Sequence, residues 1–278
     1  MRRNVIVLGD RTLTGDYGRI LSAGEARLTS GSARVIRSAG ELWLSHCRVE
    51  KVRSVGELDA QDSELIQVRS TGAAQLKGIC CGDTWSVQGS LEAESLKVRL
   101  LCGSEYGQMQ SLEWKGVLQG ETLELAMPCQ MACDLEYRQI ILSAPVSFGQ
   151  EVVCERCYCL SGITAPGINA ETIFLLNSPD VQLDYLEGSH IRIAHQFTPD
   201  RDFEAIAKQQ RYKGLTGSRE LARVHNVEGD RVELTYTRAE QVNGADVVIG
   251  PMCVIDRVAY SGSIQIDDKA MIGEVVRL

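Results

Sequence analysis

Aromatic side chains are scarce in this 278-residue sequence, at 5% of the total, although apolar residues reach 44%. A hydrophobic core is therefore feasible, but it must be built from Val, Ile, Leu and Ala rather than from large rings. The length is enough for one large domain or two ordinary ones.

Long hydrophobic runs are also missing. Near the N-terminus the longest apolar run is residues 5–8, whereas a secretory signal needs roughly 7–15 apolar residues. No stretch approaches the roughly 18 apolar residues of a membrane span. We therefore expect no transmembrane segment and a cytoplasmic protein. In that compartment its ten cysteines stay reduced unless they bind metal or do redox work.

A basic charge balance and nucleotide motifs are absent as well. The formal net charge is −8, which does not favour nucleic acid or anionic lipid as a partner. The sequence contains neither G-x-x-x-x-G-K-[ST] nor G-x-G-x-x-G, so we expect no nucleotide and no other cofactor. No short Cys–His or Ser–His–Asp arrangement can be recognised, and we predict no catalytic residue.

What the sequence does contain is a sixteen-residue repeat. The phrases "RSAGELWL", "RSVGELDA" and "RSTGAAQL" begin at residues 37, 53 and 69. Stacking the chain in rows of sixteen aligns serines, glycines and three apolar columns: Ser22, Ser38, Ser54, Ser70 and Ser86; Gly24, Gly40, Gly56 and Gly72; Ala26, Leu42, Leu58 and Ala74; Leu28, Leu44, Ala60 and Leu76; Ala33, Val49, Leu65 and Cys81.

Within a row the apolar period is two, which indicates strands. In "GELWL", Leu42 and Leu44 share one face while Glu41 and Trp43 share the other. Sixteen residues are too few for a helix-pair repeat but suit one coil of a β-solenoid, in which like residues stack about 4.8 Å apart. We therefore predict an all-β parallel β-helix. Its apolar columns fill the interior, its glycines form corners, and its serines bond to nearby backbone at those corners.

The repeat changes along the chain. After Trp85 the register slips, because Gly89 stands one place later than expected. Residues 200–213 have helical composition, with Thr198 and Pro199 as a start signal and Gly214 as a stop. Strand patterns then return. We predict a β-solenoid over residues 1–197, a short helical insertion or linker over 198–222, and a second solenoid segment over 223–278. In that segment the interior columns continue through the pairs Val232/Leu234, Val247/Ile249 and Ile264/Ile266.

The C-terminal stretch resembles bactofilins and related polymer-forming cytoskeletal proteins. The matching pieces are "VVIGPMCVI" and "SGSIQIDDKAMIGEV", in which five residues follow the family's alternating pattern: Ile264, Ile266, Ala270, Ile272 and Gly273. The resemblance implies a right-handed parallel β-helix that assembles end to end, without nucleotide, into filaments or sheets that scaffold other bacterial proteins. The implied partners are further copies of the chain and a related paralogous chain.

Both ends of the predicted solenoid are apolar. Unpaired strand edges bind other chains unless they are covered or charged. We therefore predict a polymerisation edge that comprises Val5, Ile6 and Val7 at the first strand and Ile272, Val275 and Val276 at the last. In the alternative interpretation the first and last strands fold back and cap the solenoid.

The motif "CERCYC" places Cys154, Cys157 and Cys159 close together. A C-x-x-C pair is typical of zinc sites when a second pair follows at suitable spacing, but the candidates here, Cys129 and Cys133, lie upstream as C-x-x-x-C. Cysteine also serves as a small core hydrophobe. Packing is the favoured interpretation, and metal binding or redox work by this cluster is the alternative.

Two enzyme classes are built on comparable folds. "VVIGPMC" resembles the hexapeptide repeat of left-handed β-helix acyltransferases, but a six-residue period does not persist. A carbohydrate-cleaving β-helix would need acids clustered on one exposed ladder, and Asp59 and Asp62 do not form one. We therefore expect a non-enzymatic scaffold, with a non-polymerising binding platform or the acyltransferase as alternatives.

Overall fold

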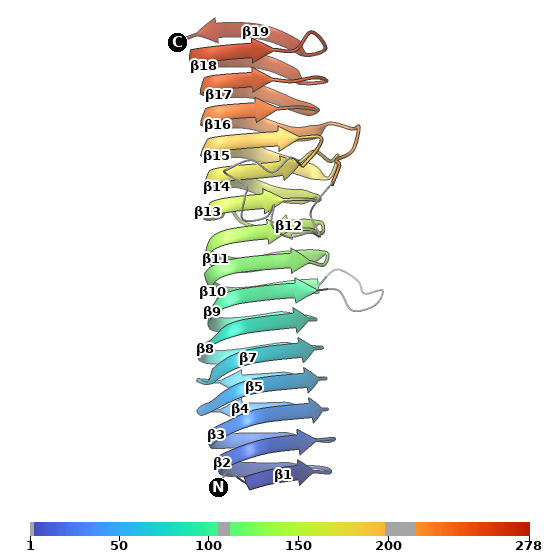
Figure 1. The fold of residues 1–278 in the computed structure, drawn as a ribbon, viewed down its shortest axis with the longest axis vertical. Helices are drawn as coiled ribbons and strands as arrows, with labels where there is room; N and C mark the ends of the chain where they lie inside the picture. The colour runs from blue at the N-terminus through green and yellow to red at the C-terminus, as the bar shows by residue number, and fades with distance from the viewer. Residues whose placement is uncertain (1–2, 105–111, 198–214) are drawn as a thin grey trace. The chain divides into compact units, whose positions relative to one another are not determined.

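The computed structural model describes residues 3–104, 112–197 and 215–278, and these fold almost entirely into parallel β-strands (Figure 1). No helix occurs within these ranges. The chain divides into two compact units, Met1–Arg138 (unit 1) and Gln139–Leu278 (unit 2). Each unit is a stack of parallel coils, which confirms the predicted all-β parallel β-solenoid.

Unit 1 is built from strands that pair with the next coil along the chain. Its strands are β1 (Arg3–Val7), β2 (Arg11–Ser22), β3 (Ala26–Ala39), β4 (Leu42–Ser45), β5 (Cys47–Val55), β6 (Leu58–Gln61), β7 (Glu64–Thr71), β8 (Ala74–Gln88), β9 (Leu91–Ser104), β10 (Leu112–Ala126) and the start of β11 (Cys129–Leu142).

Unit 2 contains the end of β11 and the strands β12 (Val146–Phe148), β13 (Val152–Cys159), β14 (Ile163–Leu176), β15 (Val181–Ala194), β16 (Ala222–Leu234), β17 (Thr237–Ile249), β18 (Val254–Ile266) and β19 (Met271–Arg277). Strands β15 and β16 pair directly, with Leu183 opposite Val224 and Ile191 opposite Val232. The coil therefore resumes in register on the far side of residues 198–214.

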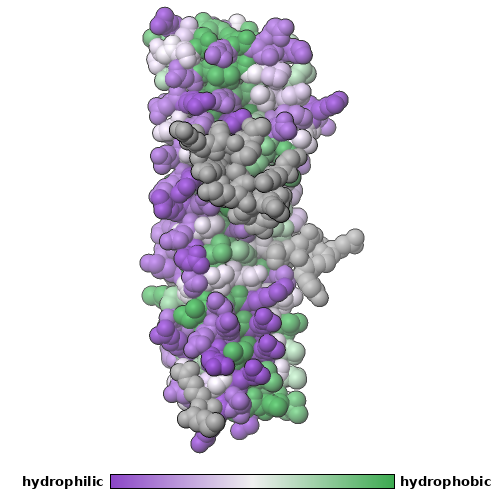
Figure 2. Space-filling view, in the orientation of Figure 1, coloured by the Kyte–Doolittle hydropathy of each residue, from purple (hydrophilic) through white to green (hydrophobic). Residues whose placement is uncertain are grey.

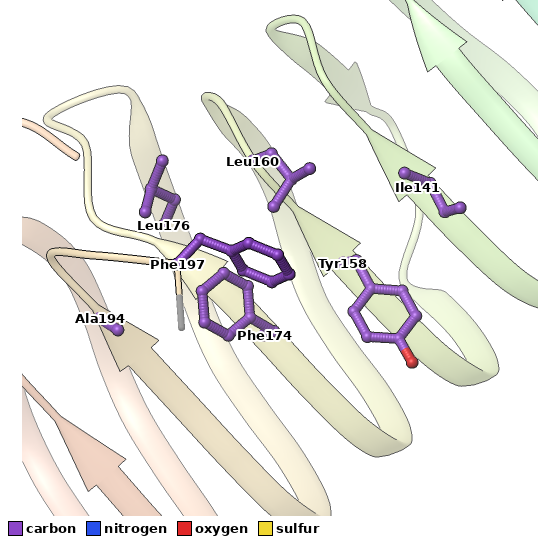
Figure 3. Close-up of a cluster of buried hydrophobic side chains, with 7 residues drawn as sticks. All are labelled: Ile141, Tyr158, Leu160, Phe174, Leu176, Ala194 and Phe197. Carbon is purple, nitrogen blue, oxygen red and sulfur yellow. The ribbon is translucent and has the colours of Figure 1, made fainter. Parts of the chain in front are cut away.

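The helix predicted over residues 200–213, with its start and stop signals, lies outside the described residues. Of the predicted insertion 198–222, the described part before β16, residues 215–221, contains no regular strand or helix. Beside it, Phe197 packs edge-on against Phe174, with ring centroids 5.0 Å apart. Figure 3 shows this buried cluster, which contains Ile141, Tyr158, Leu160, Phe174, Leu176, Ala194 and Phe197.

The sixteen-residue columns are confirmed as ladders of paired residues. Leu42 lies opposite Ala26 on one side and Leu58 on the other, and Leu44 lies between Leu28 and Ala60. All six of these side chains are at least 97% buried. The period of two thus separates interior from surface as the sequence predicts.

The register slip occurs earlier than predicted. Gln61 pairs with Lys77, sixteen residues on, but Glu64 pairs with Cys81, seventeen residues on. The extra residue is therefore accommodated between Lys77 and Cys81, where Gly78 adopts a left-handed backbone with φ of 62°. As a result Cys81 leaves the column of Ala33, Val49 and Leu65, and Ser86 pairs with Arg69 rather than with Ser70.

The corner glycines are required by both conformation and space. Gly56 has φ of 119°, a region that other residues resist. A Cβ atom at Gly56 would lie 2.8 Å from the carbonyl oxygen of Gly40 in the preceding coil. Glycine at this row position therefore lets successive corners stack at strand spacing.

The serine column faces inward beside these corners. Ser22 follows the prediction, because its hydroxyl donates to the Gly24 carbonyl at 3.0 Å. The prediction is wrong for Ser38, Ser54 and Ser70, whose buried hydroxyls have no hydrogen-bond partner. Their side chains are buried in the coil interior.

Candidate assembly surface

The interior columns of unit 2 run without a break to its last coil. Ile255 pairs with Ile272, and Val258 pairs with Val275. Ile255 and Val258 are 1% and 0% exposed, whereas Val275 is 46% exposed and Ile272 is half-buried. The same side-chain positions are therefore buried in one coil and open in the next, because no further coil covers them.

Two more columns end in the same way. Ile264 follows Val247, and Ile266 follows Ile249. Val247 and Ile249 are buried, but Ile264 is half-buried and Ile266 is exposed. The sequence pattern correctly predicts that this pair faces the interior column. It does not predict the exposure, which follows from their place in the final turn.

This apolar end, which we call the C-terminal face, comprises Ile264, Ile266, Ile272 and Val275. Strand β19 pairs with β18, and Figure 1 draws no strand beyond it in unit 2. Apolar surface is visible at this end in Figure 2. Met271 and Leu278 add exposed apolar surface in the same coil, and neither was among the residues predicted for the edge. Val276 was among the predicted edge residues, and it is half-buried.

Charged side chains also lie in the last two coils, beside the C-terminal face. The guanidinium Nε of Arg257 lies 3.3 Å from the Glu274 carboxylate. The Asp267 side chain accepts a hydrogen bond from the Lys269 amide at 2.9 Å and so holds the turn before β19. The apolar residues thus have charged neighbours, and protein interfaces commonly combine an apolar centre with polar residues beside it.

The other predicted edge, at β1 in unit 1, is less open. Val5 pairs with Ile20 and is half-buried, and Val7 is 2% exposed, so the Val7 side chain has little surface to offer. Ile6 and Leu8 are 66% and 83% exposed. The apolar surface at this end therefore lies mainly on side chains that alternate with the interior column.

The cysteines of "CERCYC" lie along β13. Cys157 and Cys159 are buried and Cys154 is half-buried. Burial raises the pKa of the Cys159 thiol to about 12, which favours the neutral form. Among residues 3–104, 112–197 and 215–278, no group of three or more His, Cys, Asp or Glu side chains is placed to hold a metal ion.

A shallow groove of about 520 Å³ follows one corner of unit 2. Its floor is a column of small residues that includes Ala170, Gly188, Gly229 and Gly244. Elsewhere, the exposed side chains of His225 and Asp184 approach each other to 3.4 Å beside a second groove. The sequence did not indicate either feature, since both depend on which residues successive coils bring together.

Comparisons with known proteins add little to this geometry. No protein-family model and no solved structure matches the chain. The chain is 44% identical over 52 residues to "Uncharacterized protein YhbE" of Bacillus subtilis (strain 168), which is 19% of this chain and 22% of that protein. The chain thus covers about a fifth of the relative's length. The described part of the structure contains no helix that could cross a membrane.

Proposed function

We propose that this protein is a non-enzymatic, bactofilin-like scaffold of the bacterial cytoplasm, which self-assembles through the ends of its β-solenoid without nucleotide. The observation that carries the proposal is the C-terminal face, where buried columns of unit 2 end in exposed apolar side chains. A second chain placed on this face would continue both the columns and the strand ladder.

The energetics favour such a contact. Burying a fully exposed Val or Ile side chain contributes roughly 1.5–3 kcal/mol. The four side chains of the C-terminal face are already partly buried, so each would contribute a part of that amount. The outer edge of β19 also presents backbone N–H and C=O groups, which a strand of a second chain would pair. These gains must exceed the cost of association, which is estimated at roughly 4–15 kcal/mol.

The partner is a further copy of this chain, or a paralogous chain with the same coil. Only a coil of matching width can extend every column at once, because each interior residue must meet a residue at the same row position. The resemblance of "SGSIQIDDKAMIGEV" to bactofilins supports the same partner. It also implies that assembly needs no nucleotide.

The test is negative-stain electron microscopy and sedimentation of the purified protein at physiological salt, with reductant and without nucleotide. We expect filaments or sheets from the wild type and dispersed particles from Val275→Asp. Val153→Asp is the matched control, because Val153 is 54% exposed on the outer side of β13. That variant should assemble as the wild type does.

Circular dichroism separates assembly from folding. Val275→Asp should keep the β signal of the wild type, and loss of that signal would place Val275 in the core rather than at an interface. Wild-type particles that stay dispersed at every concentration would contradict self-assembly. The binding-platform and acyltransferase interpretations would then take its place.

A further inference from the structure

One corner of unit 2 brings together side chains three residues apart. A Cβ atom at Gly244 would lie 2.8 Å from Cγ2 of Val247, and one at Gly229 would lie 3.3 Å from Cγ2 of Val232. Residues i and i+3 therefore meet across this corner. In these two coils residue i is glycine, and its missing side chain leaves room for the branched side chain of residue i+3.

The same corner in β13 is occupied by two cysteines. Cys154 pairs with Ala170 of the next coil, and Cys157 pairs with Ile173. Ile173 continues through Ile191 and Val232 to Val247, so Cys157 lies in the same interior column as Val247. Cys154 and Cys157 thus stand where later coils place a small residue and a branched one.

The two thiols are in contact. The Cys154 side chain hydrogen-bonds with Cys157, and this bond together with complete burial raises the pKa of the Cys157 thiol well above its usual value. Cys154 is only half-buried, so solvent reaches it. In the later coils the Cβ position of the first residue lies only 2.8–3.3 Å from the Cγ2 atom of the third residue after it. Cysteine carries its sulfur at that γ position, so this corner lets the two sulfurs approach each other.

We propose that Cys154 and Cys157 form an oxidation-sensitive dithiol that closes into a disulfide across the corner when the folded protein meets hydrogen peroxide. This inference does not depend on the proposed assembly. The accessible sulfur of Cys154 attacks one peroxide oxygen, the O–O bond breaks, and the Cys154 proton leaves with the hydroxide as water. The Cys154 side chain is then a sulfenic acid.

The buried thiol completes the reaction. The sulfur of Cys157 attacks the sulfur of Cys154, the S–O bond breaks, and a second water leaves with the Cys157 proton as the S–S bond forms. Two thiols are oxidised by two electrons, and one peroxide is reduced to two waters. Cys159 is a poorer partner for Cys154, because it lies further along β13 and its thiol donates to the Ser161 carbonyl at 3.1 Å.

The chain provides a direct readout. Trypsin cleaves after Arg156, between the two cysteines, so residues 139–156 and 157–192 remain joined only through a disulfide. The folded protein is treated with hydrogen peroxide, blocked with N-ethylmaleimide, digested and analysed by mass spectrometry. We expect the joined peptides as the main oxidised form, released by dithiothreitol.

Three variants test the pairing. The joined peptides should be lost in Cys154→Ser and Cys157→Ser and kept in Cys159→Ser, which replaces an equally buried thiol of the same peptide. Circular dichroism confirms that each variant is folded. Joined peptides that persist in Cys157→Ser would overturn the proposal, as would a folded wild type in which Cys154 is oxidised to the sulfinic acid while Cys157 stays free.

Discussion

Three serine hydroxyls in unit 1 illustrate how a repeat restricts single residues. Ser38, Ser54 and Ser70 lie at the same row position, next to the corner glycines, and are at most 5% exposed. Their hydroxyls have no partner, and a buried unsatisfied polar group costs about 1–3 kcal/mol. The column therefore selects a small side chain at a cost in stability.

Removing one hydroxyl should stabilise unit 1. We expect Ser54→Ala to raise the free energy of unfolding by up to about 1 kcal/mol, because it removes the unsatisfied group and leaves little empty volume. Ser22→Ala is the control and should lower that free energy, since the Ser22 hydroxyl bonds to Gly24. Urea denaturation of both variants measures the difference. A loss of stability in Ser54→Ala would show that its hydroxyl is satisfied.

Buried thiols make the protein sensitive to alkaline conditions. Burial raises the pKa of Cys253 from 9.0 to about 11, and Cys129 and Cys133 rise to about 12. A raised thiol pKa in the folded state contributes stability that is fully present below the unfolded value. This stability is lost as pH rises towards the folded value, since only the unfolded chain has then released the proton.

We therefore expect the free energy of unfolding to fall as pH rises from about 9 to 11, by up to roughly 1.4 kcal/mol per pH unit for each such thiol. Urea denaturation midpoints at several pH values within that range measure the slope. Cys253→Ala should be less stable at neutral pH but should show a shallower slope. An unchanged slope would mean that Cys253 ionises equally in both states.

At the scale of elements, the corners decide how closely coils stack. Gly40, Gly56 and Gly72 each have a positive φ and each lie against the glycine of the preceding coil. A side chain there would strain the backbone of its own coil and also press on its neighbour. Each corner glycine thus serves two coils at once.

Replacing one corner glycine should destabilise unit 1. We expect Gly56→Ala to lower the free energy of unfolding by at least about 1–3 kcal/mol, because φ of 119° is strained for alanine and its Cβ would meet the Gly40 carbonyl. Ser90→Ala, at an exposed turn position of the same unit, is the control and should change little. Thermal melting compares the two, and equal melting temperatures would contradict the corner argument.

At the scale of the molecule, each coil contacts only its neighbours, so stability accumulates along the stack. Leu44 is 1% exposed inside unit 1, and a buried carboxylate without a partner is costly. We expect Leu44→Asp to destabilise unit 1 by at least about 4 kcal/mol while unit 2 remains folded.

Limited proteolysis with peptide mapping tests this expectation. Cleavage should concentrate in the coils of unit 1 around β4 and spare the coils of unit 2. Leu8→Asp, at a residue that is 83% exposed, is the control and should resist cleavage as the wild type does. A Leu44→Asp protein with the melting temperature of the wild type would contradict the assignment of Leu44 to the core.

Much of the fold was predictable because neighbouring rows share their chemistry. The sixteen-residue spacing of Leu42, Leu58 and Ala74 alone predicts a buried ladder, since a parallel coil places like residues side by side. The register slip was predicted after Trp85 but occurs near Gly78. One extra residue can be accommodated at any corner, and only the strand pairing shows which corner contains it. The unsatisfied serines were missed because their row position does not reveal which way the hydroxyl points.

The candidate surface was predicted in part. Val275 and Ile272 were predicted to be edge residues from their position in the last strand, and the structure leaves Val275 exposed and Ile272 half-buried. Val7 was named on the same ground but is buried, because β1 alternates and its odd-numbered residues follow the interior column. Which residues of a terminal strand face the interior depends on how that strand pairs with the next coil. The sequence of one short strand does not specify this pairing.

The sequence by itself determined the coil: its sixteen-residue period, its interior columns and its corner glycines are all local patterns that repeat. Only the tertiary structure decided which of these residues remain exposed and which side chains meet across a corner. The physical reason is that burial and contact belong to pairs of coils. Ile249 and Ile266 share one row position, yet the first is covered by the next coil and the second is not.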